Sequence, residues 1–178
     1  MKKIVILLYI FIILGSVFAE PLVLPDSYRL ETQEDFDYYE EKIIDCINWY
    51  VTAPLDAELE FRQNLKTFVL LWLTENPAIK INMNTDVLEP VLKDEDYQFN
   101  PEIVFSYLCG MAKYAILNTE EEYDPVEEQY SGILSALFML QNNMTILYGS
   151  RGLETYLLLE NTEELRNWIA NALEKSEG

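Results

Sequence analysis

Cys46 and Cys109 are the two strongest nucleophiles of the 178-residue sequence, and each lies in a run of apolar residues at helical spacing. A reactive cysteine needs a neighbouring base or cation that lowers its pKa, whereas apolar surroundings raise it. The sequence contains no histidine, so the usual activating base is missing, and His-based triads and zinc fingers are excluded with it. We therefore assign no catalytic role to either cysteine.

A disulfide is the other chemistry that two cysteines allow. An oxidising compartment permits a bridge between Cys46 and Cys109. A free cysteine on an apolar helix face behaves instead as a small hydrophobic residue. The sequence leaves both alternatives open: a possible Cys46–Cys109 disulfide, or two buried thiols.

Carboxylates are the most abundant reactive groups, with 31 acidic and 12 basic residues and a formal net charge of −19. A glycosidase needs two carboxylates facing each other about 5 to 10 Å apart in a sugar-binding cleft. Chance pairs are inevitable in so acidic a chain, so a carboxylate-dependent hydrolase is the least favoured function. Ser106, Ser131 and Ser135 lie on predicted helices and lack the elbow motif of serine nucleophiles. We expect no enzymatic activity and assign no catalytic residue.

The acidic stretch from Asp94 to Glu102 places four oxygen ligands at even spacing, as a calcium-binding loop would. An EF-hand loop that begins at Asp94 requires a glycine at its sixth position and a glutamate at its twelfth. Phe99 and Phe105 occupy these positions. We therefore predict a solvated acidic loop, and we expect neither a metal site nor a cofactor.

Two further short motifs have ordinary explanations. Asn143-Met144-Thr145 matches a glycosylation sequon, which short sequences often contain by chance. The glycine-containing stretch Tyr148–Gly152 is not preceded by a strand and lacks the lysine of a phosphate-binding loop. We predict a tight connection there.

The first residues have the pattern of a signal peptide. Lys2 and Lys3 precede an apolar run from Ile4 to Leu14, and small residues end at Ala19. The run is too short to cross a hydrocarbon core of about 30 Å, which argues against an uncleaved anchor. We predict a signal peptide over residues 1–19, cleaved between Ala19 and Glu20, and export to the periplasm or the cell exterior.

The acidic charge bears on the partners of the mature chain. Loss of Lys2 and Lys3 leaves 31 acidic against 10 basic residues, a formal charge of −21. Nucleic acids and anionic membranes are bound through lysine and arginine, so neither is an expected partner. A protein partner remains possible, and the sequence leaves the oligomeric state open.

Helices are the elements that must position these residues. After an extended arm over residues 20–31, apolar residues recur at helical spacing through one domain, residues 32–175. The helices are expected to begin at the N-caps Thr32, Asp56, Asn100, Asp124 and Thr162, with a further helix over Leu153–Glu160. The sequence thus predicts an all-α, single-domain bundle of about five or six helices.

The central helix of this bundle is predicted over Asn100–Asn118, where Asn118 closes its C-terminus and Lys113 reaches toward solvent. We expect Cys109 to lie near Cys46, and Gly110 to lie near Gly132 or Ala136 on the helix that runs from Asp124 to Met144. In that second helix Glu127 is expected to complete a capping box.

One segment, residues 78–84, alternates apolar and polar residues and is predicted to be extended. A lone strand cannot form a sheet, so it lies across a helix pair or pairs with its counterpart in a dimer. A short turn over Val87–Leu92, interrupted by Pro90, should follow.

A family resemblance is carried by three stretches: Trp72–Met83 (WLTENPAIKINM), Asn100–Asn118 (NPEIVFSYLCGMAKYAILN) and Leu153–Ile169 (LETYLLLENTEELRNWI). Together they resemble small secreted all-α proteins of unknown function from Bacteroidetes. The resemblance spans roughly Glu34 to Leu173 and consists of packing patterns. It implies an exported all-α domain and assigns no activity or functional residue.

Two non-enzymatic functions remain. The mature chain has eleven tyrosines and three tryptophans, residue types that are enriched in interfaces. A protein–protein interaction or binding module is therefore the favoured function. The alternative is a carrier that holds an apolar small ligand in a cavity between helices.

Overall fold

The computed structural model describes residues 21–119, 123–159 and 163–176. Within these residues the chain forms eight α-helices and no β-strand. In chain order they are α2 (Gln33–Thr52), α3 (Leu59–Glu75), α4 (Thr85–Leu92), α5 (Asn100–Leu117), α6 (Pro125–Asn142), α7 (Met144–Leu147), α8 (Arg151–Leu157) and α9 (Glu163–Ser176). The predicted all-α class is confirmed. The predicted signal peptide, its cleavage site between Ala19 and Glu20, and the cap at Thr162 lie outside the described residues.

The number of helices exceeds the predicted five or six because two short helices were not expected. The first is α4, where the sequence predicts only a turn interrupted by Pro90. Asn84 caps α4 by accepting the backbone N–H groups of Asp86 and Val87 at 2.9 and 3.1 Å. Pro90 lies beyond the first turn and removes one backbone donor, but this cap and the buried Val87, Leu88 and Val91 hold the helix.

The second unexpected helix, α7, arises because the long helix predicted from Asp124 to Met144 ends early. The side chain of Asn143 turns inward at this point, accepting from the Leu55 N–H at 2.8 Å and donating to the Met139 carbonyl at 3.0 Å. The chain resumes as α7 at Met144. A side-chain contact with a distant loop therefore sets this break.

Two predicted N-caps form as expected. Thr32 accepts from the Asp35 N–H at 3.3 Å and Asp35 accepts from the Thr32 N–H at 3.0 Å, which makes a reciprocal capping box at α2. Asp124 accepts from the N–H groups of Val126 and Glu127 at 2.8 and 3.2 Å at the start of α6. These caps depend on neighbouring residues alone.

Two other predicted N-caps are wrong. Asp56 lies ahead of α3, which begins at its N-cap Glu58; this residue has a left-handed φ of 48° and makes no side-chain cap bond. Asn100 is already helical, and its side-chain amide donates to the Asp94 carbonyl at 2.7 Å instead of capping α5. At the other end of α5, Asn118 is the C-cap, as predicted.

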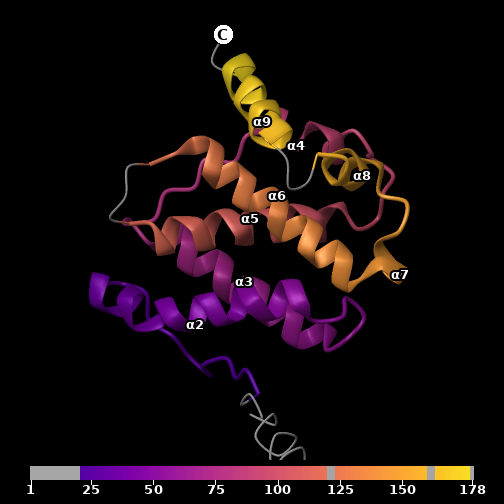
Figure 1. Cartoon of the computed structure of the whole chain (residues 1–178). Helices are drawn as coiled ribbons and strands as arrows, with labels where there is room; N and C mark the ends of the chain where they lie inside the picture. Colours follow the sequence, from indigo (N-terminus) through magenta and orange to yellow (C-terminus); the bar gives the residue numbers. More distant parts are fainter. Residues whose placement is uncertain (1–20, 120–122, 160–162, 177–178) are drawn as a thin grey trace, which may run out of the picture.

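The pair α5 and α6 lies at the centre of the molecule, with α2 and α3 on one side and α4, α8 and α9 on the other (Figure 1). A Cβ on Gly110 would lie 2.2 Å from the Ser131 carbonyl oxygen and 2.6 Å from the Ser135 Cβ. The predicted close approach of the two helices is thus confirmed. Gly110, however, faces these two serines rather than Gly132 or Ala136.

Gly132 makes a second close contact between the same helices. A Cβ there would lie 2.7 Å from the ring of Tyr107 on α5. Ser106 adds a polar contact, since its hydroxyl donates to the Ser135 carbonyl at 3.1 Å. Gly110 therefore lets the backbones of α5 and α6 approach closely, and Gly132 leaves room between them for the Tyr107 ring.

The hairpin of α2 and α3 is closed by Arg62, which is 5% exposed. Its guanidinium donates to the carbonyl of Tyr50 at 3.0 Å and to those of Ala53 and Pro54 at 2.9 and 3.0 Å. These carbonyls belong to the C-terminal end of α2 and the turn after it, where helical partners are missing. Arg62 therefore supplies hydrogen-bond donors to the free carbonyl groups at the end of α2.

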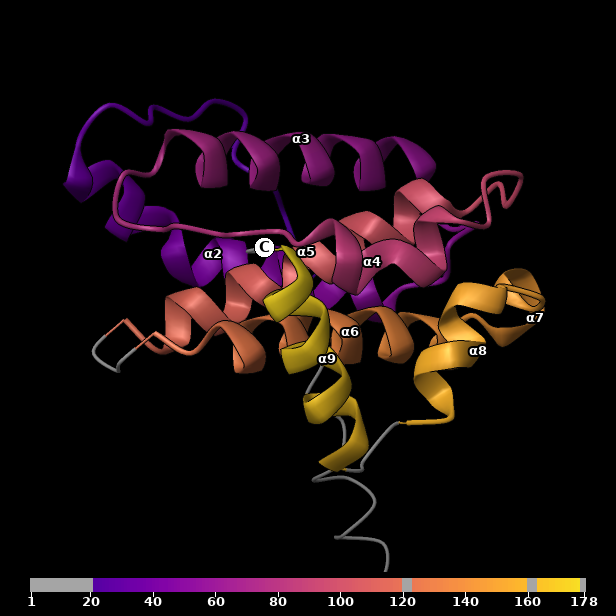
Figure 2. The same ribbon diagram turned by 90° about the horizontal axis from the view of Figure 1, so that it is seen from above.

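Irregular chain covers the remaining faces of the bundle. Residues 21–32 precede α2, and their apolar side chains pack against the core: Leu22, Leu24, Tyr28 and Leu30. Residues 79–84 form neither helix nor strand, and in Figure 2 the chain turns back after α3 and runs past it to α4. Ile79 and Ile81 from this segment also pack against the core.

The C-terminal helices join the bundle through two specific contacts. A Cβ on Gly152 of α8 would lie 2.6 Å from the Val91 Cα, so α8 touches the backbone of α4. Arg166 of α9 donates to both carboxylate oxygens of Glu127 on α6, at 2.5 and 3.1 Å, and lies over the Tyr130 ring. Glu127 therefore holds α9 and does not form the predicted capping box. Among the described helices, none is both long and apolar enough to cross a bilayer.

The substitution Gly110→Leu should test the α5–α6 contact. A side chain at this position must displace the Ser131 backbone, so we expect a loss of at least about 1–3 kcal/mol in the free energy of unfolding. Thermal unfolding followed by circular dichroism measures it. The control Asn64→Leu adds similar bulk at an exposed site on α3 and should change the melting temperature little. Equal melting temperatures for both variants and the wild type would contradict the close contact.

Candidate functional site

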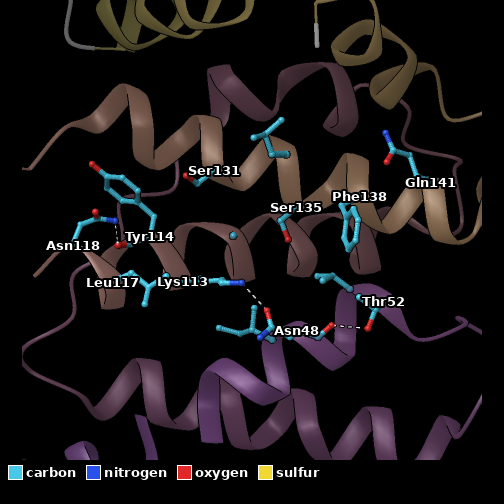
Figure 3. Close-up of a pocket in the computed structure, with 14 residues that line it drawn as sticks. Asn48, Thr52, Lys113, Tyr114, Leu117, Asn118, Ser131, Ser135, Phe138 and Gln141 are labelled. Carbon is cyan, nitrogen blue, oxygen red and sulfur yellow. Dashed lines mark hydrogen bonds between the residues drawn. The ribbon is translucent and has the colours of Figure 1, made fainter. Parts of the chain in front are cut away.

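A groove with a volume of about 580 Å³ runs between α2, α5 and α6 (Figure 3). Its described lining residues come from these three helices: Ile47, Asn48, Val51 and Thr52 from α2; Gly110, Lys113, Tyr114 and Leu117, followed by the C-cap Asn118, from α5; and Ser131, Leu134, Ser135, Phe138 and Gln141 from α6. The volume lies within the range of about 300–1,000 Å³ that is typical of small-molecule sites.

Small residues form the base of the groove. Gly110 has no side chain, and Ser131 and Ser135 face it from α6. The same residues bring α5 and α6 together, and α2 packs across both helices. The α5–α6 contact and the groove therefore share these small residues.

Apolar side chains form the walls. Ile47 and Val51 are buried on the α2 side, and Leu134 is half-buried on α6. Leu117 and Phe138 are 61% and 47% exposed, and Figure 3 places them toward opposite ends of the groove. Large apolar side chains left open to water along a concave surface favour an apolar ligand.

Lys113 supplies the charge of the groove. Its Nζ donates to the Asn48 side-chain oxygen at 2.7 Å, so the ammonium lies between α5 and α2. The sequence predicts that Lys113 reaches toward solvent; in the structure the residue is half-buried along the groove, and the hydrogen bond of its ammonium is exposed to solvent. None of the described residues that line the groove is Asp or Glu.

Cys46 and Cys109 lie in the core beside the groove and do not line it. Both are free, buried thiols. Burial raises the pKa of Cys46 to about 12 and raises that of Cys109 as well. A charge on Cys46 would raise the pKa of Cys109 further, and the helices that carry the two residues, α2 and α5, pack against each other.

A second polar cluster surrounds Glu128 on α6, which is fully buried. Its Oε2 accepts from the Tyr123 hydroxyl at 2.7 Å, while its Oε1 has no hydrogen-bond partner among the described residues. Burial raises the pKa of this carboxyl, and hydrogen bonds from Tyr123 and the Asn82 backbone partly offset the effect. The neighbouring Gln129 donates to the Asn82 carbonyl at 2.7 Å and accepts from the Tyr107 hydroxyl. The cluster thus fixes residues 79–84 against α6.

The acidic stretch at Asp94 is held by an ion pair. Arg151 of α8 donates to the Asp94 carboxylate at 2.8 Å, and this pairing lowers the pKa of the carboxyl. Within the described parts of the chain, no group of three or more Cys, Asp or Glu side chains is arranged to hold a metal ion.

The sequon Asn143-Met144-Thr145 is closed to glycosylation in this fold. Asn143 is buried, and both ends of its amide are engaged by backbone groups of Leu55 and Met139. A glycan on this amide would break both hydrogen bonds. Asn143 therefore acts as a structural link between α6 and the α2–α3 turn.

Comparison with known proteins gives no relative: the chain matches no protein-family model, no curated protein and no solved structure.

The two thiols give a direct test of their state. Native protein should react slowly with iodoacetamide at pH 8, because both thiols are buried and their pKa values are raised. After unfolding without a reductant, both should be alkylated, which intact mass spectrometry counts. Absence of labelling in the unfolded chain would mean a Cys46–Cys109 disulfide and would contradict the free thiols.

Glu128 should make stability depend on pH. Since folding raises the pKa of this carboxyl, the folded state binds a proton more tightly than the unfolded state, and the charged form opposes folding at high pH. Relative to Glu128→Gln, the wild type should therefore gain stability as the pH falls from 8 toward the ordinary value of 4.5, measured by urea unfolding. Glu60→Gln, at an exposed site on α3, is the control. The difference in unfolding free energy between this variant and the wild type should stay constant over the same pH range. A constant difference for Glu128→Gln as well would contradict the burial of the charge.

Proposed function

We propose that this chain is an exported binding protein that carries an apolar small ligand in the groove between α2, α5 and α6. The observation that supports this function is the combination of a concave shape with exposed apolar walls, Leu117 and Phe138 above all. The sequence alone favours a protein–protein interaction module and gives the carrier as the alternative. The groove favours it because a protein interface does not require such a concavity.

The size and charge of the groove fit this proposal. Its volume of about 580 Å³ suits a ligand of drug or lipid-tail size. The apolar walls would gain about 25 cal/mol for each Å² removed from water on binding. The chain as a whole carries a net charge of −19, which opposes polyanionic ligands but leaves an apolar one unaffected.

Export is part of the proposal and rests on the basic and apolar pattern of residues 1–19, which ends at Ala19. The resemblance to small secreted all-α proteins of Bacteroidetes supports the same compartment. A carrier of apolar molecules has an evident use between membranes or outside the cell, where such molecules need a soluble vehicle.

A protein partner is the second candidate. It is favoured by large apolar side chains that remain exposed in the α7–α8 region: Tyr148 is 77% exposed, Leu158 is 83% exposed and Met144 is 66% exposed. Exposed tyrosine and methionine are typical of binding surfaces. Native mass spectrometry separates the two candidates, since a lipid-sized adduct supports the groove and a discrete oligomer supports the interaction.

Binding of N-phenyl-1-naphthylamine, an uncharged fluorophore that brightens in apolar surroundings, tests the groove. The wild type should show saturable binding with one site. Thr52→Trp places a large ring at the groove margin and should weaken this binding at least about tenfold, because the ring occupies the ligand volume.

Thr67→Trp is the matched control. Thr67 is exposed on α3 and, like Thr52, its hydroxyl donates to the carbonyl four residues earlier, but it does not line the groove. The Thr67→Trp variant should bind the fluorophore as tightly as the wild type does. No saturable binding, or an equal loss in both variants, would overturn the proposed function.

A further inference from the structure

We infer that Lys113 makes the groove selective for amphiphiles with a carboxylate head group and an apolar tail, such as a medium-chain fatty acid. This inference rests on the proposed function, because it names the ligand class of the same groove. Three observations support it: the position of the ammonium, the N–H donors of the ammonium that no protein group uses, and the apolar side chains beside it.

The position of Lys113 is unusual for a lysine in so acidic a protein. The chain has 31 acidic side chains, yet the described lining of the groove contains this ammonium and no carboxylate. Its Nζ donates instead to a neutral acceptor, the Asn48 side-chain oxygen, at 2.7 Å. The groove therefore presents positive charge to a ligand although the whole chain is negative.

The ammonium has donors left for a ligand. A lysine ammonium carries three N–H donors, and the bond to Asn48 uses one of them. A carboxylate oxygen is the acceptor that gains most from the others, since hydrogen bonds between charged partners are shorter and stronger than neutral ones.

The apolar wall continues away from this charge. The groove lining on α6 includes two apolar side chains, Leu134 and Phe138, which lie about one turn apart, about 6 Å along the helix at a rise of 1.5 Å per residue. Ile47 and Val51 of α2 line the same groove. In Figure 3, Lys113 lies between the Leu117 end and the Phe138 end of the groove, so a tail can extend along the wall from a head group held at Lys113.

Other head groups fit less well. An amine head group would meet the ammonium of Lys113 with the same charge, which is unfavourable. A hydroxyl head group can accept a hydrogen bond from the ammonium, but it carries no negative charge and so lacks the ion-pair attraction that a carboxylate adds. A carboxylate should therefore bind most tightly among ligands with the same tail.

Isothermal titration calorimetry with decanoate and 1-decanol at pH 8 tests this selectivity. The wild type should bind decanoate at least about tenfold more tightly than 1-decanol, and added salt should reduce the difference. Lys113→Met keeps an apolar stem but removes the charge and its donors, so the preference for decanoate should be lost, while 1-decanol affinity should fall much less than decanoate affinity. Lys113→Arg should keep the preference.

Lys93→Met is the control for a lost lysine charge. Lys93 follows α4, is exposed, pairs with Glu89 at 2.8 Å and lies outside the groove. This variant should bind both ligands as the wild type does, and circular dichroism checks the fold of every variant. Equal binding of both ligands by the wild type, or an unchanged preference in Lys113→Met, overturns the inference and leaves the groove intact. If the wild type binds neither ligand nor the neutral fluorophore, the proposed function fails as well.

Discussion

The close approach of α5 and α6 at Gly110 is the contact on which the rest of the structure depends. A side-chain carbon at this position would lie 2.2 Å from a backbone oxygen of the other helix, so only glycine permits the observed packing. The two helices form the middle layer, with α2 and α3 on one side and α4, α8 and α9 on the other (Figure 1). The same contact leaves small residues at the base of the groove, so the fold and the candidate site share one constraint.

Around this centre, individual polar side chains fix elements that the apolar core alone would leave loosely placed. Arg62 holds the turn after α2, Asn143 links that turn to the end of α6, and Arg166 attaches α9 to Glu127. Glu128 and its neighbours hold residues 79–84. Arg62 acts within one hairpin, whereas the contacts of Asn143, Arg166 and Gln129 connect segments distant in sequence. Such polar contacts help to specify one arrangement among similar helix packings.

The parts of the fold that could be predicted from sequence are those set by neighbouring residues. Thr32 and Asp124 cap their helices as expected, and helical spacing identifies the apolar faces of α2, α5 and α6. The break at Asn143 and the burial of Glu128 depend on distant partners, so local patterns do not reveal them. The groove could not be predicted for the same reason: Gly110 was recognised as a helix contact, but its partners Ser131 and Ser135 were not, and nothing local shows that α2 leaves the space above them open.

Chemical-shift mapping by backbone NMR with decanoate tests the central claim most directly, namely that the groove created by the α5–α6 contact is a binding site. The account predicts that the largest shift changes fall on amides that line the groove, such as those of Gly110, Lys113 and Ser135, and that those of α8 and α9 stay nearly unchanged. Shift changes centred on α7 and α8, or none at saturating decanoate, would contradict it.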